Sequence, residues 1–373
     1  MDFTCVKNRM HALLELGVPG CSISIRHKHK EIYRYVCGET MQNSGKAMTG
    51  DERFFIFSCT KPITMAAVMQ LVERGVLKLE DEVARFLPEY ADVLVDEDGK
   101  LVPLNTPITI KHLMTMSAGM DYRIHAAIEA AGLPKDDTVT VRQVAAAMAK
   151  QPFCFQPGEK FKYSACHDVI GAVIQEATGM TFGEYLKKNI FDPLGMTHTN
   201  FDRNTGDILP QYECLEESGE VVFIDMKHPY NFSKNYESGG GGLVSTLDDY
   251  ALFADAMACG GVGATGNRIL TKESIDAMRE NQIGKFVRDP HFSCATGPGY
   301  GYGLGVRTLV DKSQGQRSPL GEFGWDGANG AFLIVDPENE LSFSFMQNMR
   351  NWPRLMGEFY APIRDEVYDV LGL

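Results

Sequence analysis

The segment Phe54 to Glu73, FFIFSCTKPITMAAVMQLVE, organises the rest of the chain. An apolar run leads into Ser58, and Lys61 follows three residues later. If a helix begins at Ser58, this spacing places the serine hydroxyl and the lysine ammonium on one face, one turn apart. Pro62 fits this start because proline is tolerated in the first turn of a helix. The following residues are apolar on every side up to Gly75, which predicts a helix buried at the centre of a domain.

This arrangement of serine and lysine has a chemical meaning. A serine at the N-terminus of a buried helix lies in a positive dipole field, and apolar surroundings favour the neutral form of a neighbouring lysine. A neutral amine accepts the serine's proton, which activates the nucleophile without a histidine. A Ser-x-x-Lys match nevertheless occurs by chance about once in a chain of this length. Ser58 and Lys61 are therefore candidates whose role depends on the other motifs of the chain.

The composition is that of an ordinary globular protein without a basic surface. Hydrophobic residues make up 44% and charged residues 23% of the 373 residues, and the length is enough for roughly two domains. The formal net charge of −13 argues against nucleic acid and anionic membrane as partners, since both bind basic patches. No apolar run reaches the roughly 18 residues of a membrane span, so we expect no membrane partner.

Nine cysteines are scattered singly along the chain, with no Cys-x-x-Cys pair. This pattern predicts free thiols in a reducing compartment and gives no support to a zinc site. The N-terminal stretch lacks the features of a secretory leader and has the periodicity of an amphipathic helix. We therefore expect a cytoplasmic protein that uses neither a metal nor a cofactor.

Strand patterns occur near both ends of the chain. Cys21–Arg26 and Glu31–Cys37 predict a hairpin around a polar turn, whose His27 and His29 we interpret as solvated charge rather than as metal ligands. Near the C-terminus, four segments alternate or run apolar before a final helix at about residues 356–371. These segments are Tyr302–Val310, Leu320–Trp325, Gly330–Val335 and Leu341–Gln347.

Between these strands the patterns are mostly helical. Thr181 followed by Glu184 predicts a helix start with a capping box. The glycine run Gly239–Gly242 lacks the lysine of a phosphate loop, and we interpret it as a tight turn where backbones pass closely. The expected helices are Thr109–Met116, Thr140–Lys150, His167–Ala177, Phe182–Ile190 and Leu247–Ala258.

These patterns predict the fold class. The two ends of the chain, residues 1–80 and 296–373, are expected to build one antiparallel sheet flanked by helices. A mainly helical domain, residues 81–295, is expected to be inserted between them. The prediction is therefore an α+β protein with a central sheet and an inserted helical domain.

A Ser/Lys pair also needs a group that protonates the leaving group and a group that binds the developing oxyanion. The segment Phe161–Val169, FKYSACHDV, places Tyr163 in a loop just before a helix. The segment Phe323–Gly330, FGWDGANG, places Trp325 and Gly327 at the end of a strand and the Ala328 N–H at a sharp turn. Both segments have the residue types that the chemistry requires.

Three ordered motifs, SCTK from Ser58, YSA from Tyr163 and WDG from Trp325, resemble those of the serine β-lactamase and penicillin-binding-protein superfamily. More narrowly, the chain is similar to the class C β-lactamase-like esterases, called family VIII carboxylesterases. The likeness covers nearly the whole chain. Further stretches that look like the family, in family order, are Leu113–Gly119, Phe182–Met196, Gly240–Thr246 and Tyr300–Gly305.

The resemblance implies a role for each matching residue. Ser58 would accept the acyl group, Lys61 would be its base, and Tyr163 would carry the proton to the leaving oxygen. The backbone N–H groups of Ser58 and Ala328 would form the oxyanion hole, and Trp325 and Gly327 would line the substrate site. Tyr122 would line the mouth of the pocket or have a plain packing role. The resting protonation of Lys61 and Tyr163 is a coupled titration that the sequence leaves open.

Two departures from the lactamase and transpeptidase branches narrow the substrate. The second motif there usually ends in asparagine, where this chain has Ala165, and the third usually begins with a lysine or histidine, where it has Trp325. Without that cation, a β-lactam or a peptide C-terminus is less favoured as the main substrate, and an aromatic wall suits an uncharged acyl or alkoxy group. The resemblance thus implies a carboxylesterase that acts on small-molecule, short-chain esters.

Several alternatives stay open at this stage. The same scaffold would also suit an acyltransferase, a β-lactamase or D-amino-acid peptidase, or a binding protein that has lost its chemistry. Among other candidate residues, Cys59 is interpreted as a core residue. Ser117 lacks the first glycine of a nucleophile elbow, and adjacent His167 and Asp168 face different directions on a helix, so all three are expected to be structural. The oligomeric state is not predicted.

Overall fold

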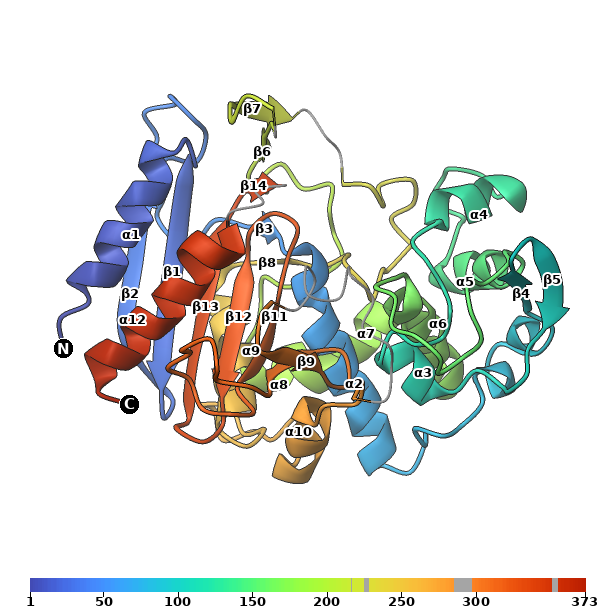
Figure 1. Ribbon diagram of the computed structural model, residues 1–373. Coiled ribbons are helices and arrows are strands. Elements are labelled where there is room, and N and C mark those ends of the chain that lie inside the picture. The colour runs from blue at the N-terminus through green and yellow to red at the C-terminus, as the bar shows by residue number, and fades with distance from the viewer. Residues whose placement is uncertain (216, 225–227, 285–296, 351–354) are drawn as a thin grey trace.

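The computed structural model describes the chain except residues 216, 225–227, 285–296 and 351–354 (Figure 1). A seven-stranded sheet lies at its centre, with the strand order β2-β1-β13-β12-β11-β10-β9 and antiparallel pairing between neighbours. The N-terminal hairpin joins the C-terminal strands through β1 and β13, which confirms the predicted fold class. The strands are β1 (Gly20–His27), β2 (Lys30–Gly38), β9 (Tyr300–Tyr302), β10 (Arg307–Leu309), β11 (Phe323–Asp326), β12 (Phe332–Asp336) and β13 (Leu341–Gln347).

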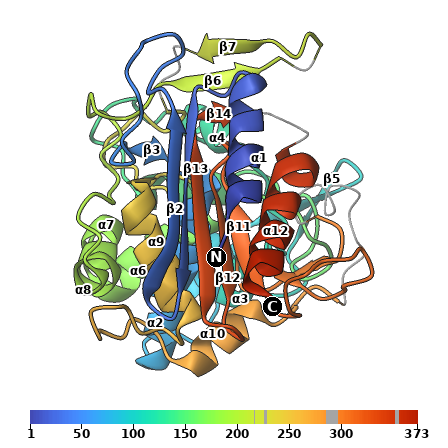
Figure 2. The same ribbon diagram turned by 90° about the vertical axis from the view of Figure 1, so that its left-hand side faces the viewer.

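Helices cover both faces of this sheet (Figure 2). Helices α1 (Thr4–Glu15) and α12 (Ala361–Leu371) pack on one face, where their apolar residues share a core with β1 and β13. Helix α9 (Leu247–Ala258) packs against β13, β12 and β1. The amphipathic N-terminal helix and the helix at 247–258 are therefore both confirmed.

The sequences of β1 and β13 show how one sheet accommodates two helical layers. Along both strands, small serines alternate with large apolar residues, and successive side chains of a strand point to opposite faces. Ile23 lies opposite Phe345 in the α1/α12 core, while Ser24 lies opposite Ser344 and points to the other face. Because these serines are short, α9 lies close to the sheet, with its own alanines towards the core.

One predicted strand is in fact two. The stretch Tyr302–Val310 divides into the ends of β9 and β10, which pair with each other across a turn. In this turn the Gly303 N–H donates to the Val306 carbonyl at 2.8 Å, and Gly305 has φ +79°. Two glycines within four residues allow the chain to reverse at a point where the apolar pattern suggests continuity.

Helix α2 (Thr60–Glu73) crosses the middle of the molecule between the sheet and the helical region (Figure 1). Every residue from Thr60 to Leu71 is buried, as the apolar sequence predicts. The helix begins at Thr60 rather than at Ser58, because a single 3₁₀ turn over Phe57–Cys59 precedes it. Pro62 lies in its first turn, and Gly75 follows its end with φ +69°.

The helical region packs against the far side of α2. Thr109, Thr140 and Thr181 cap three of its helices, and Thr181 forms the predicted capping box with Glu184. The predicted helix Phe182–Ile190 is confirmed, but from Lys187 it continues as a π-helix to Phe191. The helices are α3 (Ile110–Met114), α4 (Ile124–Ala130), α5 (Val141–Ala149), α6 (Cys166–Thr178), α7 (Phe182–Leu186), α8 (Asp192–Leu194) and, later in the chain, α10 (Lys272–Arg279).

Short strands that the sequence patterns do not indicate complete the structure. They form a three-stranded sheet with the order β14-β6-β7, an antiparallel hairpin β4–β5, and an antiparallel pair β3–β8 between segments far apart in the chain. Their bounds are β3 (Phe54–Phe55), β4 (Leu94–Glu97), β5 (Lys100–Pro103), β6 (Gln211–Cys214), β7 (Val221–Ile224), β8 (Val244–Ser245) and β14 (Met349–Arg350).

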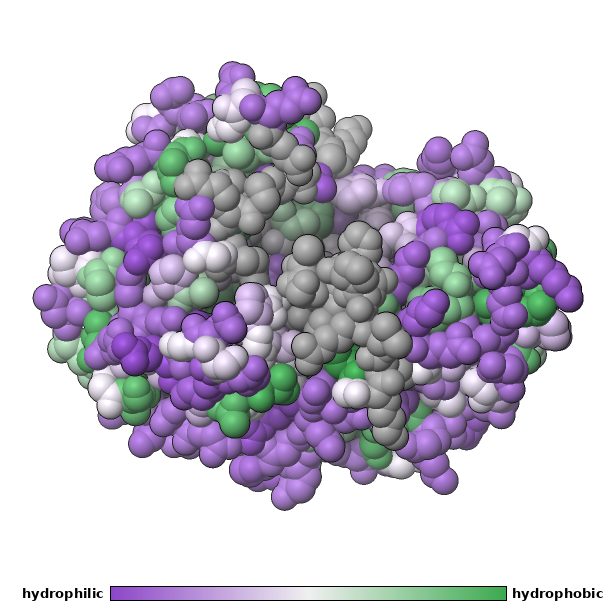
Figure 3. Space-filling view, viewed as in Figure 1, coloured by the Kyte–Doolittle hydropathy of each residue, from purple (hydrophilic) through white to green (hydrophobic). Residues whose placement is uncertain are grey.

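The visible surface and the described helices can be compared with what a membrane-spanning protein would need. Hydrophilic residues dominate the face seen in Figure 3, with apolar residues scattered between them. In the part of the chain that the structure describes, every helix is too short or too polar to cross a bilayer.

The predicted division of the chain into two domains, at residues 81 and 295, stays a prediction.

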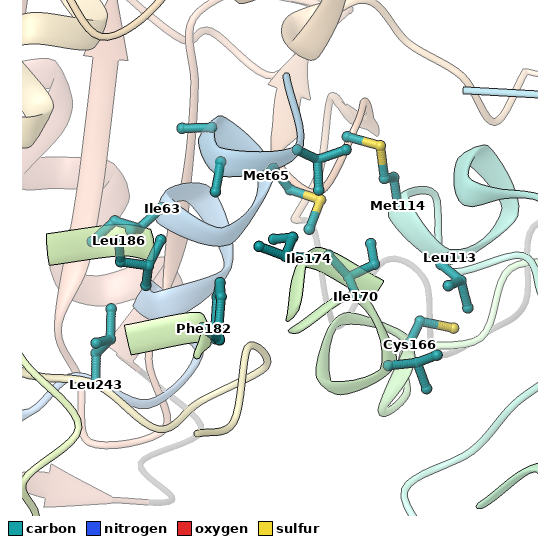
Figure 4. Close-up of a cluster of buried hydrophobic side chains, with 14 of the residues drawn as sticks. Ile63, Met65, Leu113, Met114, Cys166, Ile170, Ile174, Phe182, Leu186 and Leu243 are labelled. Carbon is teal, nitrogen blue, oxygen red and sulfur yellow. The ribbon is translucent and has the colours of Figure 1, made fainter. Parts of the chain in front are cut away.

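The core of the helical region is formed around α2 and α7. Figure 4 shows Phe182 beside Leu186 and Ile63, and the Phe182 ring also contacts Phe201 with the ring centroids 5.5 Å apart. Phe182 is 0% exposed. This ring therefore joins the central helix to the helical region.

We predict that Phe182→Ala lowers the free energy of unfolding by about 3–5 kcal/mol, because it removes a buried ring and leaves a cavity. Urea unfolding followed by circular dichroism measures the change. The matched control is Phe223→Ala on β7, where the phenylalanine is 55% exposed and the change should stay within about 0.5 kcal/mol. Equal losses in the two variants would contradict this description of the core.

Candidate active site

Ser58 lies in the sharp turn between β3 and α2. Strand β3 pairs with β8, which fixes the path of the chain as it approaches the turn. Phe57 has φ +43°, in the left-handed region that large side chains rarely occupy. Its ring stacks on His228, with the centroids 4.9 Å apart and 15° between the planes. The strained residue is thus held by packing, and the half-buried Ser58 follows it directly.

Lys61 lies one turn further along and is 0% exposed. Its Nζ atom is 3.1 Å from Ser58 Oγ, which confirms the predicted common face. The same nitrogen donates to the Gly240 carbonyl at 2.6 Å and is 3.0 Å from the Tyr122 hydroxyl. The lysine amine is therefore surrounded by three oxygens inside the protein.

The Gly240 carbonyl reaches Lys61 because of the glycine run at 239–242. A Cβ atom at Gly239 would collide with the His167 carbonyl, and one at Gly240 would collide with the Asp168 carboxylate. Thr64 of α2 also donates from its hydroxyl to the Gly239 carbonyl at 2.7 Å. The run is therefore a close passage of backbone between α2 and α6, as the sequence predicts.

Tyr163 and Trp325 form an aromatic wall beside the lysine. The Trp325 Nε1–H donates to the Tyr163 hydroxyl at 3.1 Å, and the two rings stack with their centroids 5.4 Å apart. Lys61 Nζ lies 4.6 Å from the centroid of the Tyr163 ring. Tyr302 packs edge-on against the other side of Trp325. The second and third motifs therefore meet the first in space.

Two phenols, rather than one, lie next to Lys61. The hydroxyl 3.0 Å from Nζ is that of Tyr122, while the hydroxyl of Tyr163 is held by Trp325. The two tyrosine rings are 5.6 Å apart. Tyr122 is 41% exposed as a residue, but its hydroxyl points inward to the buried amine. This desolvation, together with the neighbouring Tyr163, holds the pKa of Tyr122 well above its usual value.

Sequence reasoning placed Tyr122 only at the mouth of the pocket or in a packing role. Its contact with Lys61 depends on how the loop after Gly119 folds back, and no local pattern shows this. The hydrogen bond from Lys61 to the Gly240 carbonyl was also not predicted, although the glycine run predicted that backbones pass closely there.

The turn that follows β11 lies against the turn that carries Ser58. A Cβ atom at Gly327 would collide with the Ile56 carbonyl, so only glycine allows this approach. The turn is closed by the Gly330 N–H, which donates to the Gly327 carbonyl at 2.8 Å. Ala328 is exposed at its tip. Ser58 and Ala328 therefore belong to two neighbouring turns.

The remaining sequence candidates have structural roles. Cys59 is buried and its thiol points to the Trp325 and Ala331 carbonyls, so burial raises the pKa of the thiol. Ser117 is buried and bonds to the Thr115 hydroxyl at 2.8 Å. His167 Nε2 lies 3.2 Å from the Met114 carbonyl, and burial lowers its pKa well below the usual value.

Asp168 supports the glycine run from behind. It is fully buried, and its Oδ1 atom accepts from the Tyr236 hydroxyl at 2.8 Å and from the Ser238 hydroxyl. Burial raises the pKa of Asp168, while the Ser238 hydroxyl and Lys61 act in the opposite direction. The adjacent His167 and Asp168 thus face different parts of the core and do not form a triad with Ser58.

Comparisons with known proteins agree with this fold. The family model described as Beta-lactamase matches residues 4–361. The chain is 29% identical to Esterase EstB of Burkholderia gladioli over 385 residues, with 96% of this chain and 92% of the relative covered. It is 30% identical to a lovastatin esterase of Penicillium rubens, with 83% of each chain covered.

A solved structure described as EstCE1, a hydrolase with promiscuous acyltransferase activity, superposes with a TM-score of 0.82 at 25% sequence identity, and 98% of each chain is covered. The antiparallel sheet, the helical layers and the three meeting motifs are those of an enzyme fold that carries a reactive serine. The chain belongs to the β-lactamase family, as the sequence motifs predicted.

We predict that Asp168→Asn changes how stability depends on pH. A raised pKa means that the folded protein holds this proton to a higher pH than the unfolded chain, whose carboxyl titrates near 3.8. The stabilising contribution is present below that value and is lost as the pH rises through the raised pKa. The variant should therefore gain stability relative to wild type as the pH rises above about 4.

Urea unfolding at several pH values measures this difference. The matched control is Asp51→Asn, which changes an exposed carboxyl and should leave the difference independent of pH. A difference for Asp168→Asn that is constant, or that falls with pH, would contradict the prediction.

Proposed function

We propose that this enzyme is a carboxylesterase that cleaves short-chain, small-molecule esters through an acyl-enzyme on Ser58. The observation that carries the proposal is the fully buried Lys61 amine, 3.1 Å from Ser58 Oγ. The esterase names of two relatives that align over more than four-fifths of this chain support the same reaction class.

The hydrogen bonds of Lys61 indicate how the proton moves. A carbonyl oxygen only accepts, so one N–H of Lys61 is committed to Gly240. A neutral amine bonded in this way has one N–H and one lone pair left for the hydroxyls of Tyr122 and Ser58, and the lone pair can accept the Ser58 proton. When Oγ attacks the ester carbonyl carbon, the new C–O bond forms, the carbonyl π pair moves to oxygen, and Lys61 takes the serine proton.

The oxyanion needs donors on the side opposite the lysine. We assign this role to the backbone N–H groups of Ser58 and Ala328, which lie in the two turns that touch at Ile56 and Gly327. Donors of this kind contribute about 3 kcal/mol each to the transition state. Because both turns are fixed by packing, the donors are oriented before the substrate arrives.

The leaving alcohol needs a proton when the tetrahedral intermediate collapses. Trp325 donates its N–H into the oxygen of Tyr163, so the phenol keeps its own O–H proton available for the departing alkoxide. The proton that Lys61 took from Ser58 then restores the phenol through the Tyr122 hydroxyl, which lies 3.0 Å from Nζ and interacts with Tyr163. Deacylation repeats these steps with water as the nucleophile, which releases the carboxylic acid and regenerates Ser58.

Trp325 also favours an uncharged substrate. It stands where the lactamase and transpeptidase branches have a cation, and its ring is almost completely buried between Tyr163 and Tyr302. An apolar wall attracts an acyl or alkyl group rather than a carboxylate. Transfer of the acyl group to an alcohol instead of water is the second candidate, favoured by the described activity of EstCE1. A reducing, cytoplasmic compartment remains part of this proposal.

We predict that a p-nitrophenyl phosphonate ester adds one phosphonyl group to the wild-type protein and releases nitrophenol, because Ser58 is the activated hydroxyl. Intact-protein mass spectrometry measures the adduct. Ser58→Ala should show neither the adduct nor turnover of p-nitrophenyl butyrate, while Ser117→Ala should keep both. An adduct on Ser58→Ala would overturn the assignment of the nucleophile.

We predict that Tyr163→Phe lowers kcat for p-nitrophenyl butyrate by about 10²-fold or more, because the leaving group loses its proton donor. Tyr122→Phe removes the phenol hydroxyl that lies 3.0 Å from the lysine amine, and should lower kcat by less than Tyr163→Phe. Steady-state kinetics of both variants measure the two effects. A larger loss in Tyr122→Phe would transfer the proton-donor role to Tyr122.

A further inference from the structure

A group of metal-ligand side chains lies outside the active site. His29 Nδ1, a carboxylate oxygen of Asp255 and Cys259 Sγ all lie within 4.8 Å of one another. His29 is in the turn between β1 and β2, and the other two residues are at the end of α9. The sequence predicts the turn histidines to be solvated charge rather than metal ligands; the His29 side chain is 37% exposed, and its ring also bonds to the buried Asp255.

The local backbone positions each of the three side chains. Lys28 and His29 form a two-residue hairpin turn in which both have positive φ, 52° and 66°. The turn is held by the Lys28 N–H, which donates to the Glu340 carbonyl at 2.9 Å. On α9, Asp255 and Cys259 are four residues apart, so they lie on the same face, one turn from each other.

Asp255 is an almost completely buried carboxylate with a single hydrogen bond and one ion pair. Its side chain is 1% exposed, and its Oδ2 atom lies 2.9 Å from His29 Nδ1. Among the described residues, its Oδ1 atom has no hydrogen-bond partner. Arg26 Nε lies 3.6 Å from Oδ1, as an ion pair. One carboxylate oxygen therefore faces the arginine, and the other faces the histidine.

We propose that His29, Asp255 and Cys259 bind a divalent transition metal of the zinc type. One nitrogen, one oxygen and one sulfur ligand form a donor set that suits Zn²⁺, with water in the fourth position. Binding displaces the protons of the Cys259 thiol and of any imidazolium into solvent. Arg26 stays on the outer carboxylate oxygen and orients it, as groups around metal ligands commonly do.

The charges around the group are compatible with a dication. The Asp255 carboxylate and the metal-bound Cys259 thiolate carry two negative charges, and Glu340, which also acts electrostatically on Cys259, adds a third. Arg26 contributes one positive charge. The metal would join the tip of the β1–β2 hairpin to the end of α9, and β13 packs against both elements.

Calorimetric titration of chelator-treated full-length protein with ZnCl₂ tests the proposal. We expect saturable 1:1 binding in the wild type, with affinity lowered at least about tenfold in Cys259→Ser and in His29→Gln. The matched controls are His27→Gln in the same hairpin and Cys5→Ser, which changes another half-buried thiol. Both controls should bind like the wild type.

Two further measurements show whether the Cys259 thiolate itself binds the metal. Co²⁺ should give a thiolate-to-metal charge-transfer band in the wild type and in Cys5→Ser, but not in Cys259→Ser. Excess Zn²⁺ should raise the thermal midpoint of the wild type and not that of Cys259→Ser. Ester turnover should be unchanged in all variants, which shows that they are folded. No saturable binding in the wild type, or equal binding in Cys259→Ser, would overturn the proposal.

Discussion

The structure of the proposed active centre depends on the completely buried amine of Lys61. Taking an amino group out of water costs several kcal/mol unless polar partners surround it. Lys61 finds them in the Gly240 carbonyl and the hydroxyls of Tyr122 and Ser58. Each partner belongs to a different part of the chain, so the helix, the glycine run and the tyrosine loop must assemble together. The hydrogen-bonding needs of one buried amine therefore link the stability of the fold to the geometry of the proposed catalytic site.

The residues that hold the partners of Lys61 in place also make specific contacts. The glycine run passes so close to α6 that side chains at Gly239 and Gly240 would collide with it, and Asp168 ties the run to the hydroxyls of Tyr236 and Ser238. On the other side, Trp325 fixes the Tyr163 hydroxyl and ring. Fixed donors and acceptors lower the reorganisation needed in the transition state. The buried groups around the site thus hold the glycine run and Tyr163 in position.

The sheet contributes through its layered packing. Alternation of serines and large apolar residues on β1 and β13 allows two helices to pack on one face and α9 to approach closely on the other. The same closeness brings the end of α9 to the hairpin turn, where Asp255 meets Arg26 and His29. The contacts at the β1–β2 turn and the packing of α9 on the central sheet therefore follow from one arrangement. The side chains at the turn take no part in the chemistry proposed for Ser58.

The sequence by itself determined the elements with strong local signals. Apolar periodicity, threonine caps and terminal glycines located the buried helix after Ser58 and the helix at 247–258. Strand patterns at the two ends of the chain predicted the antiparallel sheet. The i, i+3 spacing predicted that Ser58 and Lys61 meet. Only the tertiary structure decided what lies around them. Which phenol contacts Lys61, where the Gly240 carbonyl points and how His29 reaches Asp255 depend on contacts between segments far apart in the chain. Local patterns do not encode such contacts, because they arise when the core packs.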